Sequence, residues 1–418
     1  MYQGHKVIDV DTHVTPSLEV LARYADKELK DRWGELKPYT RVMKPAPGRG
    51  HPETDYSILR INPIPYARVA GMKEGQKNEG TGAGSKGALE GRVNNLATKA
   101  IHVNVQHDNS VGRLADMDVE GVDINLILPS TWACGTTALD LGLAKSIYRA
   151  YHLYMKDYCS ADSRRLKGLI LAPAADPEWA AAQIRELAKQ DWPAAVWPLI
   201  PEGTPVDDPD LAPIWAAMND TNLPYVHHSF FYEPPYFPGY RDIWGNIVVA
   251  RTAAHVWGAE RLLAYVLISG MLDKYPNLRI GTVETGHGWL PNWIIRLTSQ
   301  AHFVNDAIPT GLKHSPMEYV KMGRVFCGIE NHEGPLMTKA VNDILGDHVL
   351  MYQSDYPHPE SLFPNAVKTV FAWKDTLGEV ATRKLMGENA ARWLRLQSHP
   401  WSSTGSTGER VATAGGRG

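Results

Sequence analysis

The stretch Lys6–His13, KVIDVDTH, is predicted to form a buried strand that ends in an aspartate and a histidine two residues apart. Residues two apart on a strand point to the same face, so Asp11 and His13 share one face at the strand's carboxyl end. A carboxylate oxygen and an imidazole nitrogen side by side supply half of the ligands of a metal site. A strand-end aspartate that caps a turn beside a surface histidine explains this short motif equally well.

The composition is that of a globular protein with a large core. The chain has 418 residues, of which 44% are hydrophobic and 21% are charged. This length suits one large α/β barrel with insertions, or two domains. The formal net charge is −3 and no long basic stripe is present. We therefore expect a small-molecule substrate and no nucleic-acid partner.

The cysteines and the amino terminus indicate a reducing, intracellular environment. Cys134, Cys159 and Cys327 lie far apart and form no CxxC pair, so we predict buried structural thiols. Residues Met1–His5 lack an apolar signal core, and no apolar run approaches the length that spans a membrane. We expect a cytoplasmic protein without a membrane partner.

Seven further short apolar stretches follow the first strand, and helix-like segments separate many of them. The predicted strands are 123–129, 166–173, 194–199, 223–229, 278–284, 324–330 and 348–355. The predicted helices are 17–29, 139–161, 177–189, 207–221 and 246–274. Such alternation indicates right-handed βαβ units and a parallel sheet. Eight units favour an α/β fold of the TIM (β/α)8 barrel type over residues 1–396.

A long insertion is predicted at residues 37–105, directly after the first strand. It contains a Pro/Gly-rich segment at 45–50 and a Gly-, Lys- and Glu-rich segment at 74–87, which is typical of a mobile loop. An insertion at this point would hang over the end of the barrel that bears Asp11 and His13. We interpret it as a substrate lid, and an insertion without a role is the alternative. Residues 397–418 are expected to form a flexible carboxyl-terminal tail.

Residues that can bind metal recur at the predicted strand ends. In a barrel the chemistry lies at the carboxyl ends of the strands. Besides Asp11 and His13, these ends carry His227 and His228, Glu284 and Asp355; a histidine at one strand end alone is usually a core or surface residue. Carboxylates gathered on one rim repel one another, and a divalent cation would relieve that repulsion.

Several motifs resemble those of the amidohydrolase superfamily. The most similar branch contains aminocarboxymuconate-semialdehyde decarboxylase and the resorcylate decarboxylases. The matching stretches are 7–13, 116–123, 223–228, 269–278, 289–291, 353–358 and 388–391. The resemblance covers almost all of residues 5–395 apart from the insertion. It implies a distorted TIM barrel with one divalent metal ion, and a homodimer.

The resemblance also implies roles for individual residues. Asp11, His13, His228 and Asp355 match the metal ligands of the family, and Asp355 also matches the residue that moves the proton. His227 then faces the other way along its strand, and we predict that it packs in the core.

The sixth predicted strand departs from the pattern of the decarboxylases, which carry a histidine where this chain has Glu284. We predict that Glu284 binds the metal, holds a water or acts as an acid or base. His287, three residues later, is predicted to be catalytic in place of the missing imidazole. The alternatives are an ion pair at the rim for Glu284 and an ordinary loop position for His287.

Further residues are predicted to surround the reacting atoms. His358, which lies just beyond Asp355, is expected to orient that carboxylate or to bind substrate, and we count it among the catalytic residues. Phe230, Tyr232 and Trp289 are predicted to bind the substrate. Aromatic side chains after His228 could equally pack the mouth of the barrel.

The predicted activity is the non-oxidative decarboxylation of a small aromatic or unsaturated carboxylic acid. The predicted strand 194–199 lacks the lysine of binuclear relatives, so one metal ion is expected, with zinc favoured over manganese or iron. The alternative is a hydrolase that cleaves an amide, a lactone or a C–C bond with a metal-activated water, which Glu284 keeps open. A barrel that binds a ligand without turnover is disfavoured, because every ligand-type position is occupied.

Overall fold

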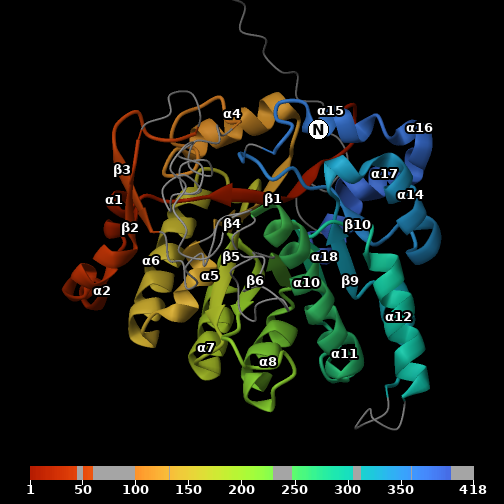
Figure 1. Ribbon diagram of the computed structural model, residues 1–418. Helices are drawn as coiled ribbons and strands as arrows, with labels where there is room; N and C mark the ends of the chain where they lie inside the picture. The colour runs from red at the N-terminus through yellow and green to blue at the C-terminus, as the bar shows by residue number, and fades with distance from the viewer. Residues whose placement is uncertain are drawn as a thin grey trace, which may run out of the picture.

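Eight parallel strands among the described residues form one sheet that curls into a barrel (Figure 1). The computed structural model describes residues 1–44, 50–59, 99–130, 132–228, 247–304, 312–358 and 360–396. The strands of this sheet are β1 (Ile8–Val14), β4 (Ile124–Pro129), β5 (Leu166–Pro173), β6 (Pro193–Leu199), β7 (Tyr225–His228), β8 (Ile280–Val283), β9 (Val325–Gly328) and β10 (Leu350–Met351). Each of them pairs with the next one along the chain, so the predicted TIM barrel is confirmed.

Backbone hydrogen bonds between β1 and the segment after β10 bring the two ends of the sheet together. The N–H of Asp355 donates to the carbonyl of Asp11 (3.0 Å), and the N–H of His13 donates to the carbonyl of Tyr356 (2.7 Å). These bonds place the first and the last predicted ligand positions side by side, although they lie at opposite ends of the barrel sequence.

Helices pack around the outside of the strands (Figure 1). Those that follow the strands in the chain are α4 (Ser110–Glu120), α5 (Trp132–Gly135), α6 (Leu141–Cys159), α7 (Pro177–Leu187), α8 (Ala212–Thr221), α10 (Ile247–Ile268), α11 (Met271–Lys274), α12 (Leu290–Phe303), α13 (Pro316–Lys321) and α14 (Gly334–Leu345). The short helices α1 (Leu18–Ala22) and α2 (Lys27–Asp31) follow β1, and α15 (Ala366–Phe371), α16 (Lys374–Leu377), α17 (Glu379–Arg383) and α18 (Asn389–Trp393) follow β10.

Side-chain caps define where several helices begin. The carboxylate of Asp140 accepts from the N–H of Leu143 at the start of α6, and that of Asp176 accepts from Trp179 at the start of α7. Each cap satisfies a backbone donor that has no partner inside the helix. The sequence therefore fixes these starts locally, within one or two residues of the prediction.

Three predicted elements differ from the structure for identifiable reasons. The predicted helix 17–29 is split into α1 and α2, because Asp26 is extended and its side chain caps α2 by accepting from the N–H of Leu29. The predicted helix 246–274 is split into α10 and α11, because Gly270 has a φ of +78° that a continuous helix does not allow. The predicted strand 348–355 is paired only over Leu350–Met351. Beyond Met351 the N–H of Tyr352 donates to the carbonyl of Leu385, and the chain then contacts β1 through isolated backbone hydrogen bonds instead of a regular ladder.

Part of the predicted insertion 37–105 has regular structure. Strands β2 (Thr40–Met43) and β3 (Tyr56–Leu59) form a two-stranded antiparallel sheet. Backbone pairing between residues on either side of 45–50 stabilises this hairpin, which has no clear alternation in the sequence. The predicted mobile loop 74–87 and the predicted tail 397–418 lie outside the described residues.

The strands are buried on both faces, as a barrel covered by helices requires. Cys159 and Cys327 are buried free thiols, as predicted, whereas the side chain of Cys134 lies outside the described residues. None of the described helices combines the length and apolar character that crossing a membrane would need.

Candidate functional site

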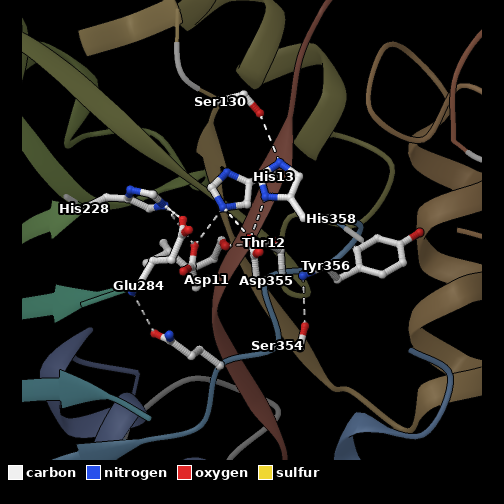
Figure 2. Close-up of polar contacts among 12 residues, drawn as sticks. Asp11, Thr12, His13, Ser130, His228, Glu284, Ser354, Asp355, Tyr356 and His358 are labelled. Carbon is white, nitrogen blue, oxygen red and sulfur yellow. Dashed lines mark hydrogen bonds and ion pairs between the residues drawn. The ribbon is translucent and has the colours of Figure 1, made fainter. Parts of the chain in front are cut away.

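Five side chains from four strand ends converge at the carboxyl end of the barrel (Figure 2). Asp11 and His13 belong to β1, His228 ends β7, Glu284 directly follows β8, and Asp355 lies beyond β10. Because the carboxyl ends of parallel strands lie at the same end of a barrel, residues far apart in sequence meet there.

The ring nitrogens of two histidines lie between the carboxylates of this cluster. The Nε2 atom of His13 is 3.1 Å from Oδ1 of Asp11 and 3.0 Å from Oδ1 of Asp355. The Nε2 atom of His228 is 2.8 Å from Oε2 of Glu284 and 3.8 Å from Oδ1 of Asp11. Ligand atoms of Asp11, His13, His228 and Glu284 all lie within 4.8 Å of one another. Ligands around one cation lie about 3–4 Å apart, since each is about 2.0–2.3 Å from it, so small adjustments would suffice.

Both carboxylates that follow strands have an unusual backbone conformation. The φ angles of Glu284 and Asp355 are +49° and +59°, in the left-handed region. This region costs a residue with a side chain on the order of 1 kcal/mol or more, and the surrounding structure has to supply that energy. The left-handed turn directs each carboxylate toward the cluster. An extended backbone at the same position would direct it elsewhere.

Burial and mutual attraction set the charges of the cluster. Burial by itself would lower the pKa of His13, but the adjacent Asp11 and Asp355 carboxylates raise it well above its usual value. Burial likewise opposes ionisation of Glu284, yet His228 holds the pKa of that carboxyl well below its usual range. For Asp11, burial outweighs the attraction of His13 and raises the pKa. Without a cation, protonated imidazole therefore offsets the carboxylate charge.

Unsatisfied buried atoms show that these residues fit a cation. Among the described residues, neither carboxylate oxygen of Asp11 and neither ring nitrogen of His13 makes a well-formed hydrogen bond, although they approach to 3.1 Å. Buried polar groups normally have hydrogen-bond partners, and a bound cation would satisfy these. Imidazole nitrogens together with carboxylate oxygens suit zinc, manganese or iron.

His358 extends the cluster toward solvent. Its Nδ1 atom is 2.7 Å from Oδ1 of Asp355, and its ring stacks on that of His13 with centroids 4.2 Å apart. Its Nε2 atom is 3.5 Å from the hydroxyl of Ser130, and the side chain is 22% exposed. Burial would raise the pKa of Asp355, but His358 foremost holds it below its usual value. His358 therefore lies where it can orient Asp355 and exchange a proton with it.

The structure places His287 away from the cluster. Its Nε2 atom is 3.0 Å from the hydroxyl of Thr338, and its Nδ1 atom is 3.0 Å from Oε2 of Glu333. The N–H of Glu330 also points at Nδ1, at 3.2 Å. Because both nitrogens of this buried ring are engaged by the protein, the geometry favours a supporting role for His287 over the catalytic role that the spacing suggested.

Of four other predicted residues, the structure describes two, Trp289 and His227. The indole N–H of Trp289 donates to the carbonyls of Thr285 and Gly286 at 2.9 Å, just before α12. His227 is buried, which lowers its pKa to about 3, and it belongs to no metal-capable group among the described residues. The predicted substrate contacts are Phe230 and Tyr232, and both lie outside the described residues.

Three residues beside the cluster have no role in the sequence-based prediction. The Nδ1 atom of His255, on α10, lies 3.8 Å from Oε1 of Glu284. Gln353 bonds to Glu330, which follows β9, at 2.9 Å. The strand-end criterion that selected Glu284 would also have selected Glu330, whereas no sequence signal marks a histidine in the middle of a helix.

A parallel barrel with imidazoles and carboxylates gathered at its carboxyl rim defines a class of barrel with a metal-capable centre. The family model for amidohydrolases matches residues 143–396, more than half of the chain. The chain therefore belongs to the amidohydrolase family of enzymes. The match includes His228, Glu284 and Asp355, and begins after Asp11 and His13. No curated protein matches the chain.

Solved structures share the fold over nearly the whole chain. A 5-carboxyvanillate decarboxylase mutant from Novosphingobium aromaticivorans, with bound manganese and a nitrobenzoic acid, has 19% identity and a TM-score of 0.64, covering 94% of this chain and 98% of its own. An amidohydrolase from Mycobacterium avium subsp. paratuberculosis has 19% identity and a TM-score of 0.64, covering 93% and 99%. A 2,6-dihydroxybenzoate decarboxylase from Rhizobium has 16% identity and a TM-score of 0.62, covering 94% and 99%. At these identities the likeness establishes the fold.

Proposed function

We propose that this chain is a metal-dependent, non-oxidative decarboxylase of a small aromatic carboxylic acid. The observation that carries the proposal is the buried cluster of two imidazoles and three carboxylates at the rim of an amidohydrolase barrel. The similar folds of enzymes that decarboxylate 5-carboxyvanillate and 2,6-dihydroxybenzoate support it.

Asp11, His13, His228 and Glu284 would hold one divalent cation, with Asp355 beside it. When bound, the cation supplies a Lewis acid that polarises the oxygens of a substrate carboxylate. With Asp355 beside these four residues, three carboxylates and two imidazoles surround the cation, and oxygen donors suit manganese. Manganese, which one of the similar structures contains, is therefore the first metal to test, ahead of the zinc that the sequence favoured.

Asp355 and His358 would handle the proton of the reaction. Asp355, which is ionised at rest, would take up a proton through His358 and deliver it to the ring carbon that bears the substrate carboxylate. When the C–C bond breaks, its electron pair restores the aromatic ring and carbon dioxide leaves. His358, 2.7 Å from Asp355 and partly exposed, would return a proton to Asp355 between turnovers.

Hydrolysis is the second candidate, and the Asp355–His358 contact favours it. Because His358 keeps the pKa of Asp355 below its usual value, Asp355 is ionised at neutral pH and is suited to take a proton from an attacking water. The substrate would then contain an amide, a lactone or an activated C–C bond.

Other features of the proposal rest on the sequence. Phe230 and Tyr232 stay predicted contacts of the substrate, and residues 37–105 stay a predicted lid. A homodimer and a cytoplasmic location also stay predictions.

Metal analysis tests the first step of the proposal. The purified protein should contain about one manganese or zinc per chain, and His228→Ala should contain less than about a tenth of that amount. His302→Ala removes an exposed histidine of α12 as the matched control and should keep the parent's metal content. A metal-free parent that takes up neither ion after reconstitution would contradict the proposal.

A product assay separates the two reactions. The metal-loaded enzyme is incubated with 2,6-dihydroxybenzoate, 5-carboxyvanillate and related acids, and in parallel with aryl amides and lactones. Release of carbon dioxide that falls at least about 100-fold in Asp355→Asn supports decarboxylation. Cleavage of an amide or lactone without carbon dioxide supports hydrolysis instead.

A further inference from the structure

A buried glutamine connects the ends of three neighbouring strands beside the cluster. Gln353 is 2% exposed and follows β10. Its Nε2 atom donates to Oε1 of Glu330, which follows β9, at 2.9 Å. Its Oε1 atom accepts from the backbone N–H of Glu284, which follows β8, at 3.4 Å. The amide has one orientation that serves both partners, since a carboxylate accepts and a backbone N–H donates.

Glu330, which binds this amide, is itself held in place by a hydrogen bond from its backbone. The backbone N–H of Glu330 donates to Nδ1 of His287 at 3.2 Å, and Nε2 of His287 lies 3.0 Å from the hydroxyl of Thr338 on α14. A chain of contacts therefore runs from helix α14 through His287, Glu330 and Gln353 to the backbone of Glu284. His287 therefore supports the site through Glu330 and Gln353, although its imidazole does not contact the cluster.

The last residue of β9 leaves room for the amide. A Cβ atom at Gly328 would lie 1.8 Å from Oε1 and 2.6 Å from the side-chain carbonyl carbon of Gln353. No larger residue fits there while the glutamine keeps its position, so the close approach requires glycine.

The strained backbone of Glu284 explains why such support is needed. With a φ of +49°, Glu284 has a conformation that its own side chain disfavours, and its backbone N–H is fixed by the amide of Gln353. The other left-handed carboxylate, Asp355, is fixed in the same manner by its N–H bond to the carbonyl of Asp11. Each strained carboxylate of the cluster thus has its own backbone hydrogen bond.

We propose that Gln353 is a positioning residue for the metal centre, which clamps the backbone of Glu284 to Glu330 so that the Glu284 carboxylate is held ready for the cation. This inference rests on the proposed metal site. Residues that orient ligands in this way typically change metal affinity by about 10- to 100-fold when they are replaced.

Three variants that keep the net charge of the parent test the proposal by titration of Mn²⁺ against a fluorescent chelator. Gln353→Met removes both hydrogen bonds and should weaken Mn²⁺ binding by about 10- to 100-fold. Gly328→Ala should displace the amide and weaken binding in the same direction. The double variant Gln353→Glu with Glu330→Gln exchanges the amide and the carboxylate, which preserves both bonds, and should bind within about threefold of the parent.

Gly168→Ala serves as the control for packing strain. Gly168 is on β5, away from the cluster. A Cβ atom added there would lie 2.6 Å from Met155, so Gly168→Ala should lower the melting temperature and leave the Kd for Mn²⁺ unchanged. An unchanged Kd in Gln353→Met, or an exchanged double variant as weak as Gln353→Met, would overturn the positioning role. A parent that binds no Mn²⁺ would instead overturn the proposed metal site.

Discussion

Arg113 is a buried cation that binds the first strand beside the cluster. Its side chain is fully buried, and its guanidinium donates to the hydroxyls of Tyr158 (3.0 Å) and Thr12 (3.1 Å) and to the carbonyl of His13. It also lies over the ring of Tyr356, 5.1 Å from the centroid. A single planar cation thus joins α4, β1 and the segment after β10 at the level of the site.

Replacement of Arg113 by lysine should destabilise the protein. An ammonium group cannot match the fork of donors of a guanidinium, so buried acceptors would lose their partners. We expect Arg113→Lys to lower the free energy of unfolding of the metal-free protein by about 2–4 kcal/mol, measured by urea denaturation. The control is Arg164→Lys, in the exposed pair with Asp162, which should cost less than about 0.5 kcal/mol. Equal losses in the two variants would remove this role from Arg113.

At the scale of elements, a buried carboxylate joins helix α4 to helix α15. Glu120, the last residue of α4, accepts from the N–H of Val367 in the first turn of α15 at 2.7 Å. Burial raises the pKa of Glu120 from 4.5 to about 7, because the backbone N–H groups of Val367 and Ala366 do not replace the lost water. The helix that carries Arg113 is therefore docked by a contact that depends on pH.

The sign of this dependence follows from the protons that each state binds. Between pH 4.5 and about 7 the folded protein keeps a proton on Glu120 that the unfolded chain has lost, so stability falls as the pH rises and levels off above pH 7. Glu120→Gln keeps the acceptor and cannot ionise. Relative to the parent, it should gain up to about 3 kcal/mol of unfolding free energy between pH 5 and pH 8. Parallel pH profiles of parent and variant, from urea denaturation, would contradict this.

At the scale of the whole molecule, the cluster connects the ends of the barrel. Asp11 and His13 come from the first strand, Asp355 follows the last, and Glu284 lies between them in sequence. Without a cation only protonated imidazole offsets the charge of these buried carboxylates, whereas a bound cation attracts all of them directly. Metal binding and stability of the whole fold should therefore be linked.

Removal of the metal should lower the melting temperature of the parent. A cation at 100 times its Kd stabilises the folded state by about 2.7 kcal/mol, which corresponds to several degrees in a protein of this size. Calorimetry with EDTA, and then after restoration of Mn²⁺, measures the shift. His228→Ala should melt at the same temperature with and without the ion, and a shift of equal size in that variant would place the stabilising site elsewhere.

The barrel and most of the cluster were predictable because they are encoded locally. Short apolar strands alternate with helical segments, and Asp11, His13, His228, Glu284 and Asp355 stand at the points where strands end. The rule that barrel chemistry lies at one rim then gathers these residues without knowledge of any distance. The predicted starts of the helices 139–161 and 177–189 likewise lie within two residues of the starts of α6 and α7.

Only the tertiary structure distinguishes the residues that form the cluster from the residues that hold them in place. His287 lies three residues from Glu284, yet the left-handed backbone at Glu284 and Gly286 turns the chain so that its ring contacts Thr338. Glu330 has the same chemistry as Glu284 at the next strand end, but it binds Gln353. The alternation of side chains along a strand shows only which face of that strand a residue occupies. The direction of a side chain beyond a strand end depends on loop dihedrals and on hydrogen bonds between distant segments, which no local pattern contains.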